Sequence, residues 1–160
     1  MELPHPPGDS SKRIDSVAIV ARAQALKRAS AAGQTPRLLV GKNVALMLAA
    51  EGPDADLFRK AAAALGARVA TIRATLPKSN APDEMLRTAQ MLERLYDAVE
   101  CQGVPRQHVE QIRSAAAMPV FDGLASSRHA SARLDAGLDD DDPQRNRLFV
   151  VLAILVESVL

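Results

Sequence analysis

Residues 41–72 read GKNVALMLAAEGPDADLFRKAAAALGARVATI, and this stretch decides the fold. The continuous apolar run at 44–48 is typical of a strand that is buried on both faces of a parallel sheet. The alanine-rich run at 57–65 predicts a helix that lies close to this sheet, and Gly66 is expected to end it in a left-handed turn. Because residues 68–72 predict a second strand, the stretch forms a βαβ unit.

Strand and helix patterns continue to alternate on either side of this unit. Further strands are predicted at 97–101 and 118–121, and further helices at 12–32, 83–95, 106–116 and 144–160. This order predicts an α/β fold: a four-stranded parallel sheet with helices on both faces, closed by a C-terminal apolar helix. The predicted organisation is a disordered tail at 1–11, one domain at 12–138, an acidic linker at 139–143, and a helix at 144–160 that packs back on the domain.

Local patterns add three expectations. The apolar spacing of the first helix predicts a buried stripe made of Ile14, Val17, Ala21, Ala25, Ala29 and Ala32. Ile19, Val20 and Leu26 lie off this stripe, which leaves a broader buried face open. Asp54 or Asp56 is expected to cap the second helix. Residues 125–142 look irregular, and the four aspartates at 139–142 are interpreted as a solvated linker that charge repulsion keeps extended, in preference to a metal site.

Composition restricts the class of function. The chain of 160 residues carries 20 Lys and Arg against 19 Asp and Glu, with only 2% aromatic residues, which disfavours nucleic-acid binding. Its longest apolar run, 148–156, is shorter than the roughly 17–25 residues that cross a bilayer, so no membrane partner is expected. The single cysteine, Cys101, fits a cytoplasmic protein without disulfides, and the histidines have no ligand spacing, so neither a metal nor another cofactor is predicted.

The loop after the first strand carries the first indication of function. In α/β folds, ligands bind where a strand ends and the next helix begins, because that helix presents unpaired backbone N–H groups. Here residues 49–56 read AAEGPDAD, which contains three carboxylates and no Lys, Arg, Ser or Thr. The loop therefore lacks the side chains that usually hold a phosphate.

Several short segments, in their order, resemble one enzyme family. They are LVGK at 39–42, LFRKAA at 57–62, LGA at 65–67, YDAV at 96–99 and MPVFDGL at 118–124. Over residues 14–129 the chain resembles the N-terminal, carbamoyl-phosphate-binding domain of the aspartate and ornithine carbamoyltransferases, most closely the ornithine branch. The final helix, with NRL at 146–148, is similar to the helix that follows the family's second, amino-acid-binding domain. Only the acidic linker stands between the two parts, so this second domain is missing there.

The resemblance implies where ligand-binding residues would lie. The family's Ser-Thr-Arg-Thr-Arg phosphate motif falls at 51–55, where every arginine and hydroxyl is absent. The family's arginine after the third strand falls at Gln102, and of its His-Pro-x-Gln motif only His129 matches. The predicted crevice is thus lined by Glu51, Asp54, Gln102 and His129, with no catalytic residue. Lys78 lies in a loop that, in the aspartate branch, supplies a lysine to a neighbouring subunit.

These losses predict a degenerate, non-catalytic carbamoyltransferase-like domain that acts by oligomerisation or by association with a partner. The resemblance implies a homotrimer, or a mixed oligomer with a full-length carbamoyltransferase. Two alternatives remain open: binding of a small metabolite, an amine or an amino acid, in the altered crevice, and residual carbamoyltransferase activity, which the missing donors disfavour most.

Overall fold

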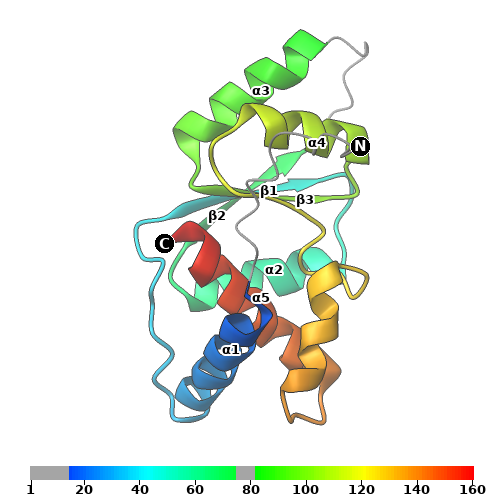
Figure 1. The fold of residues 1–160 in the computed structure, drawn as a ribbon. Coiled ribbons are helices and arrows are strands. Elements are labelled where there is room, and N and C mark those ends of the chain that lie inside the picture. The colour runs from blue at the N-terminus through cyan, green and yellow to red at the C-terminus, as the bar shows by residue number, and fades with distance from the viewer. Residues whose placement is uncertain (1–14, 75–81) are drawn as a thin grey trace, which may run out of the picture.

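A four-stranded parallel sheet forms the centre of the protein (Figure 1). The computed structural model describes residues 15–74 and 82–160; the predicted tail at 1–11, Ile14 and Lys78 lie outside these ranges. The strands lie in the order β2-β1-β3-β4. Their bounds are β1 (Asn43–Leu48), β2 (Arg68–Arg73), β3 (Ala98–Gln102) and β4 (Val120–Asp122). The predicted α/β fold with a parallel sheet is confirmed.

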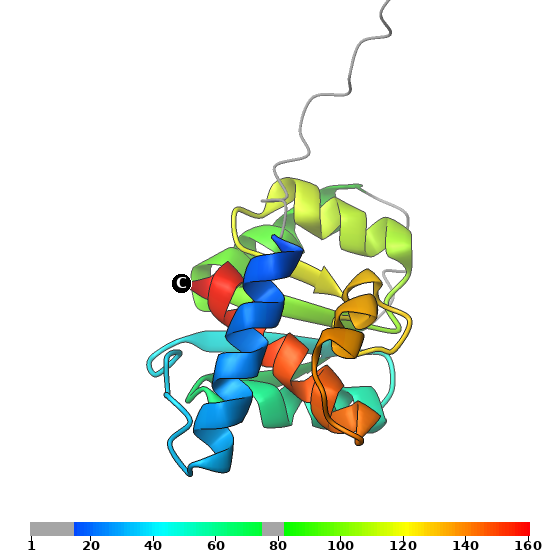
Figure 2. The same cartoon turned by 60° about the horizontal axis from the view of Figure 1, so that its bottom comes forward.

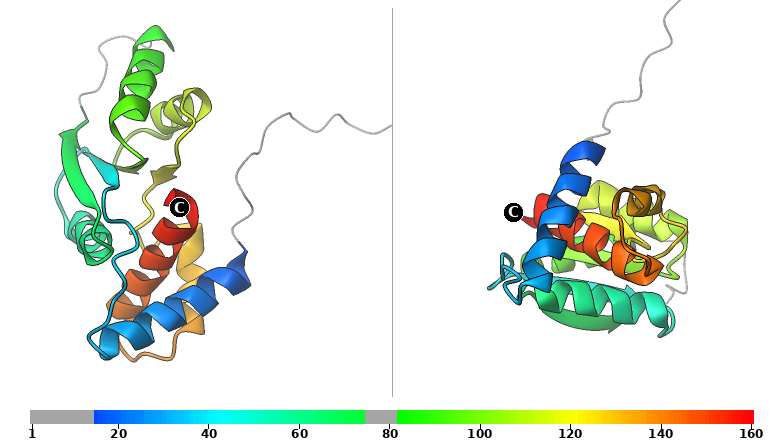
Figure 3. Two further views of the ribbon diagram at one scale, coloured as in Figure 1. Left: turned by 90° about the vertical axis from the view of Figure 1, so that its left-hand side faces the viewer. Right: turned by 90° about the horizontal axis from the view of Figure 1, so that it is seen from below.

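Helices cover both faces of the sheet (Figures 1 and 3). One face packs against α3 (Pro82–Leu95) and α4 (Arg106–Ala115), and the other is covered by α2 (Pro53–Ala64) and α5 (Pro143–Val159). The remaining helix, α1 (Ser16–Ala31), packs on α5. Because successive side chains of a strand point to opposite faces, Leu46 belongs to the α5 side and Met47 to the α4 side. This double burial explains why β1 is continuously apolar. Within the described ranges, no helix combines the length and hydropathy needed to cross a membrane.

The start of α2 differs from the prediction. Gly52 is the N-cap and contributes no side chain, whereas Asp54 and Asp56 lie in the first turn, where their charges favour the positive end of the helix dipole. The end of the helix agrees with the prediction, because Gly66 has a φ of +85°. A Cβ atom at Gly66 would lie 2.7 Å from Val40 Cγ2, so both the backbone conformation and the close approach require glycine there.

The buried face of α1 also differs from the prediction. Ile19, Ala23 and Leu26 are buried, whereas Val17, which belongs to the predicted stripe, is 78% exposed. Two stripes overlap on this alanine-rich helix, and periodicity alone does not choose between them. The contact with α5, which α1 crosses in Figure 2, selects the stripe that carries the larger side chains.

Residues 125–142 contain regular structure that the sequence pattern did not reveal. Ala130–Gly137 form a 3-10 helix, η1, which begins after His129. η1 packs against both α1 and α5. Leu124, which precedes this segment, and Leu138, which follows η1, are buried in the same core as α5. The prediction of an irregular segment is therefore wrong for the part that approaches α5.

The acidic run at 139–142 is held by specific partners and is not extended by repulsion. The Asp140 carboxylate lies 3.1 Å from Lys27 Nζ and 3.3 Å from Arg145 Nε. The Asp142 side chain accepts the backbone N–H of Gln144 at 3.0 Å and so caps α5. Attraction to basic groups on α1 and α5 thus orders Asp140, and a helix cap orders Asp142.

Helix α5 is the most deeply buried helix of the described chain. Every residue from 149 to 156 is buried, in agreement with the unbroken apolar run. The helix packs against α1 and α2, and an ion pair between Arg22 and Glu157 joins its outer end to α1. The apolar sequence of α5 is therefore explained by neighbours on several sides.

Substitutions on α1 test the corrected face. We expect Leu26→Ala to lower the free energy of unfolding by about 2–5 kcal/mol, because it opens a cavity against α5. Val17→Ala, on the exposed side, should change it by less than about 0.5 kcal/mol. Urea denaturation measures both values. Equal costs for the two variants would contradict the assigned face.

Candidate functional site

The candidate site lies at the carboxyl ends of β1 and β3. These two strands are neighbours in the sheet. From β1 the chain crosses to β2 on one side, and from β2 it returns to β3 on the other side of β1, so the connections diverge between β1 and β3. Such a divergence is the usual ligand position in open α/β sheets. The backbone N–H of Ala49 donates to the Gln102 carbonyl at 3.0 Å and ties the two strand ends together.

Glu51 is engaged by an arginine of the following helix. Arg59 donates from Nη1 to Glu51 Oε2 at 2.8 Å and from Nη2 to Glu51 Oε1 at 2.7 Å. This two-pronged pair lowers the pKa of the Glu51 carboxyl. Arg59 Nη2 also donates to Thr71 Oγ1 on β2 at 3.0 Å. The guanidinium nearest the loop is thus oriented toward β2 and is already bound to a carboxylate.

Gln102 is half-buried at the end of β3, whereas Asp54 is exposed at the start of α2. The half-buried Gln102 side chain donates from Nε2 to Glu100 Oε2 at 3.4 Å. Glu100 is fully buried, and its carboxylate also accepts the backbone N–H groups of Leu124 at 3.0 Å and Ala125 at 3.2 Å. Asp54 is exposed on the first turn of α2, and its negative charge acts on Arg147 of α5. The site is therefore dominated by carboxylates.

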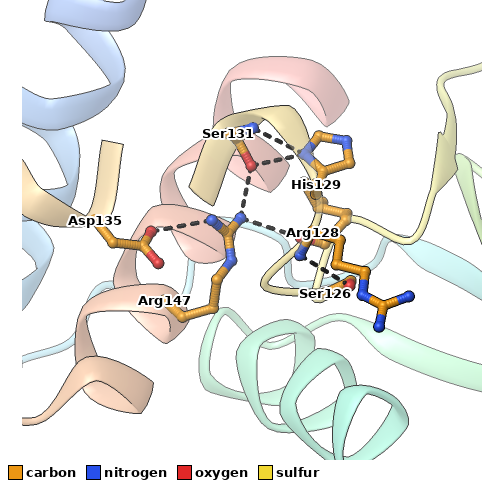
Figure 4. Close-up of polar contacts among 7 residues, drawn as sticks. Ser126, Arg128, His129, Ser131, Asp135 and Arg147 are labelled. Carbon is orange, nitrogen blue, oxygen red and sulfur yellow. Dashed lines mark hydrogen bonds and ion pairs between the residues drawn. The ribbon is translucent and has the colours of Figure 1, made fainter. Parts of the chain in front are cut away.

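His129 belongs to a polar cluster at the start of η1 (Figure 4). Its Nδ1 accepts the backbone N–H of Ser131 at 3.1 Å and lies 2.8 Å from Ser131 Oγ. Burial, followed by the charge of Arg147, lowers the pKa of the His129 imidazole. Because Nδ1 serves as an acceptor, the neutral ring carries its proton on Nε2.

Arg147, at the start of α5, is the centre of this cluster. Its Nη2 donates to Ser131 Oγ at 2.6 Å and to the Leu124 carbonyl at 3.0 Å, and its Nη1 donates to Asp135 Oδ1 at 3.0 Å. We call His129, Ser131, Asp135, Arg147 and the Leu124 carbonyl the Arg147 cluster. Only 5% of Arg147 is exposed, so the guanidinium is a buried charge that these partners must satisfy.

The structure divides the four predicted crevice residues between two environments. Glu51 faces Arg59, whereas His129 belongs to the Arg147 cluster, Gln102 contacts Glu100, and Asp54 acts on Arg147 through its charge. Sequence reasoning missed Glu100, Ser131, Asp135 and Arg147 as members of the site. A signal existed for two of them: Glu100 is the one charged residue inside an apolar strand, and Arg147 directly precedes nine apolar residues.

Cys101 follows Glu100 on β3 and points to the other face of the sheet. Its thiol is buried among residues of α3 and α4. Burial raises the pKa of the thiol to about 12, so the nucleophilic thiolate is absent at neutral pH. Cys101 is therefore a core residue.

Comparison with known proteins relates this chain to one enzyme family. The chain is 36% identical over 110 residues to the ornithine carbamoyltransferase of Actinobacillus pleuropneumoniae serotype 5b, which covers 68% of this chain and 33% of that protein. It is 34% identical over 113 residues to the catabolic ornithine carbamoyltransferase of Burkholderia mallei, which covers 70% of this chain and 34% of the relative. The chain carries a carbamoyltransferase-like domain.

Solved structures agree with this assignment. The ornithine carbamoyltransferase from Pyrococcus furiosus superimposes with a TM-score of 0.61 at 25% identity, over 68% of this chain and 35% of the other. The catalytic subunit of the aspartate transcarbamoylase from M. jannaschii shares the fold with a TM-score of 0.62 at 17% identity, over 78% of this chain and 41% of the other. No family model matches the chain. The carbamoyltransferase-like domain spans about a third of the length of the curated relatives it matches.

The Arg147 cluster generates a stability prediction. Arg147→Ala should lower the free energy of unfolding by about 3–5 kcal/mol, because it leaves Asp135 and the Leu124 carbonyl without their buried donor. Arg145→Ala, two residues earlier, removes an ion pair to Asp140. Because the Arg145 side chain is 44% exposed, this substitution should lower the free energy of unfolding by about 1 kcal/mol or less. Guanidinium denaturation of both variants measures the difference, and a similar cost for both would contradict the structural role of Arg147.

Proposed function

We propose that this carbamoyltransferase-like domain is non-catalytic and acts by associating with other protein chains. The observation that carries the proposal is the pairing of Arg59 with Glu51 beside the loop that follows β1. In the family, this loop holds the phosphate of carbamoyl phosphate. Here Glu51 of the loop neutralises Arg59 of α2, and the loop itself supplies no cation or hydroxyl side chain.

Electrostatics at the start of α2 supports the same conclusion. The helix N-terminus would favour an anion through its backbone N–H groups. Asp54 and Asp56 already complement this positive end from the first turn. A phosphate dianion placed there would meet these carboxylates in addition to Glu51, and like charges a few ångströms apart repel by several kcal/mol at a protein surface.

Association is supported by what the fold retains and exposes. The domain has a complete core, in which α5 buries eight consecutive residues, 149–156. On the opposite side of the sheet, α3 leaves three large apolar side chains partly uncovered: Leu86, Met91 and Leu95 are 43%, 50% and 57% exposed. Apolar surface of this kind is commonly covered by another protein. By analogy with the family, we propose a homotrimer or a mixed oligomer with a full-length carbamoyltransferase.

Ligand binding tests the non-catalytic part of the proposal. In a thermal-unfolding assay, we expect no stabilisation by carbamoyl phosphate or inorganic phosphate, because Arg59 is already paired with Glu51 and the loop carries carboxylates in place of donors. A functional site would raise the free energy of unfolding by about 2.7 kcal/mol at a ligand concentration of 100 times Kd. A full-length ornithine carbamoyltransferase serves as the positive control. Saturable stabilisation by carbamoyl phosphate would overturn the proposal, whereas stabilisation by an amine or amino acid alone would assign the altered site to a different metabolite.

Solution mass tests the association. Light scattering across a range of protein concentrations should give a mass above that of the 17.1 kDa monomer, approaching three times this value for a homotrimer. Mixing with a full-length ornithine carbamoyltransferase from the same cell should yield a co-eluting complex if the oligomer is mixed. A strict monomer at high concentration that also fails to co-elute would exclude both forms of association.

A further inference from the structure

Helix α3 has an outer face that is exposed to solvent. Its inner face is anchored, because Ala89 and Leu92 are fully buried in the core on this side of the sheet. Figure 1 shows α3 at the outer edge of the molecule, with α4 beside it. On the outer face, Met91 and Leu95 are 50% and 57% exposed. Because residues four apart are neighbours on a helix surface, these two apolar side chains form one exposed patch.

Charged residues extend this patch in a regular pattern. Intervals of three, four and three residues separate four exposed side chains: Glu84, Arg87, Met91 and Arg94. We call these four residues the α3 stripe. A shallow hollow in the surface follows the last three of them. The spacing is that of the contact line along a helix that pairs with a second helix, and here an acid stands at its start and a base at its end.

The charges of the α3 stripe are not used by the rest of the described chain. None of the ion pairs among residues 15–74 and 82–160 involves Glu84, Arg87 or Arg94. The neighbouring helix α4 differs, because all its exposed residues are polar and its Arg113 is paired with Glu110 at 2.6 Å. An apolar centre between charges that have no ion-pair partner in these ranges therefore distinguishes α3 from α4.

We propose that the α3 stripe pairs with the same stripe of a second copy of this chain, with the two helices antiparallel. In this orientation, Glu84 of one copy lies opposite Arg94 of the other, and Arg87 lies opposite Met91. A two-fold contact makes every such pairing twice, so the acid and the base of each copy are both satisfied. The Met91 side chains meet near the two-fold axis and are covered there by the aliphatic parts of the arginines.

The charge pattern favours a second copy in this one orientation. A parallel pair would place Glu84 beside Glu84 and Arg94 beside Arg94, and such like-charge contacts oppose binding. In the antiparallel pair the same residues attract, and the opposite ends of the two helix dipoles lie side by side. The stripe is thus complementary to itself, which is what an interface between identical chains requires.

This inference rests on the proposed function, association between protein chains, and adds a surface and a symmetry to it. A two-fold pair closes after two chains, so its signature is a doubling of mass. A trimer has a different symmetry and would use another surface, and the α3 contact would then join two trimers.

Charge reversal along the stripe tests the pairing. Light scattering over a range of protein concentrations gives the self-association constant of each variant. We expect Glu84→Arg and Arg94→Glu, each alone, to weaken self-association at least about tenfold, because like charges then face each other. The double variant, and an equimolar mixture of the two single variants, should recover to within about threefold of the unaltered protein, because opposite charges meet again.

A matched control separates this contact from general effects of charge. Lys60→Glu reverses an exposed charge on α2 and changes the net charge as Arg94→Glu does, so it should leave self-association unchanged. A loss of helix stability would also give a different result. Each single reversal opposes the dipole of α3, since Glu84 lies in its first turn and Arg94 in its last. That effect alone would make the double variant the weakest to associate, whereas the pairing predicts its recovery.

The outcomes distinguish the pairing from the proposed function. Unchanged self-association in both single variants would overturn the pairing and leave the proposed function standing through another surface. Failure of both the double variant and the mixture to recover would overturn the pairing as well. If the reversals abolish binding to a full-length carbamoyltransferase and spare self-association, that partner occupies the stripe in place of a second copy. A strict monomer that binds no such partner would remove the proposed function together with the pairing.

Discussion

The buried guanidinium of Arg147 is the interaction on which the carboxyl end of the sheet depends. It joins three segments that are far apart in the chain, since it binds the Leu124 carbonyl after β4, Ser131 and Asp135 in η1, and is itself part of α5. A charge that is taken out of water is tolerated only where such partners surround it. The position of α5 relative to the sheet is therefore specified by a polar contact as well as by its apolar face.

Other polar groups near the carboxyl end of the sheet are also engaged by partners within the chain. Arg59 is paired with Glu51, the Glu100 carboxylate occupies the N–H groups of Leu124 and Ala125, and His129 is bound to Ser131. Among the described residues, these polar groups are therefore already bound within the chain. The domain has thus kept the carbamoyltransferase frame while its polar groups serve the fold, which is the basis for proposing that it acts through association.

The fold was largely predictable because its signals are local and repeated. The run at 44–48 is apolar at every position. A strand that is buried on both faces needs such a continuous apolar run, whereas a half-exposed strand would alternate apolar and polar residues. The turn at Gly66 was predictable for a similar reason, because glycine reaches a positive φ without strain. By contrast, the buried face of α1 was not predictable, because two stripes of small and apolar residues overlap on this helix. Only the packing of α1 against α5 decides which of them is buried.

By itself, the sequence determined the parallel α/β sheet, the burial of α5 and the absence of phosphate donors from residues 51–55, because these depend on residue types and their periodicity within one segment. Only the tertiary structure decided which charges meet. Arg147 and Asp135 are separated by 12 residues, and Glu100 and Leu124 by 24. Such pairs leave no periodic signal, because a buried polar contact depends on how separate elements pack and not on the spacing within any one of them.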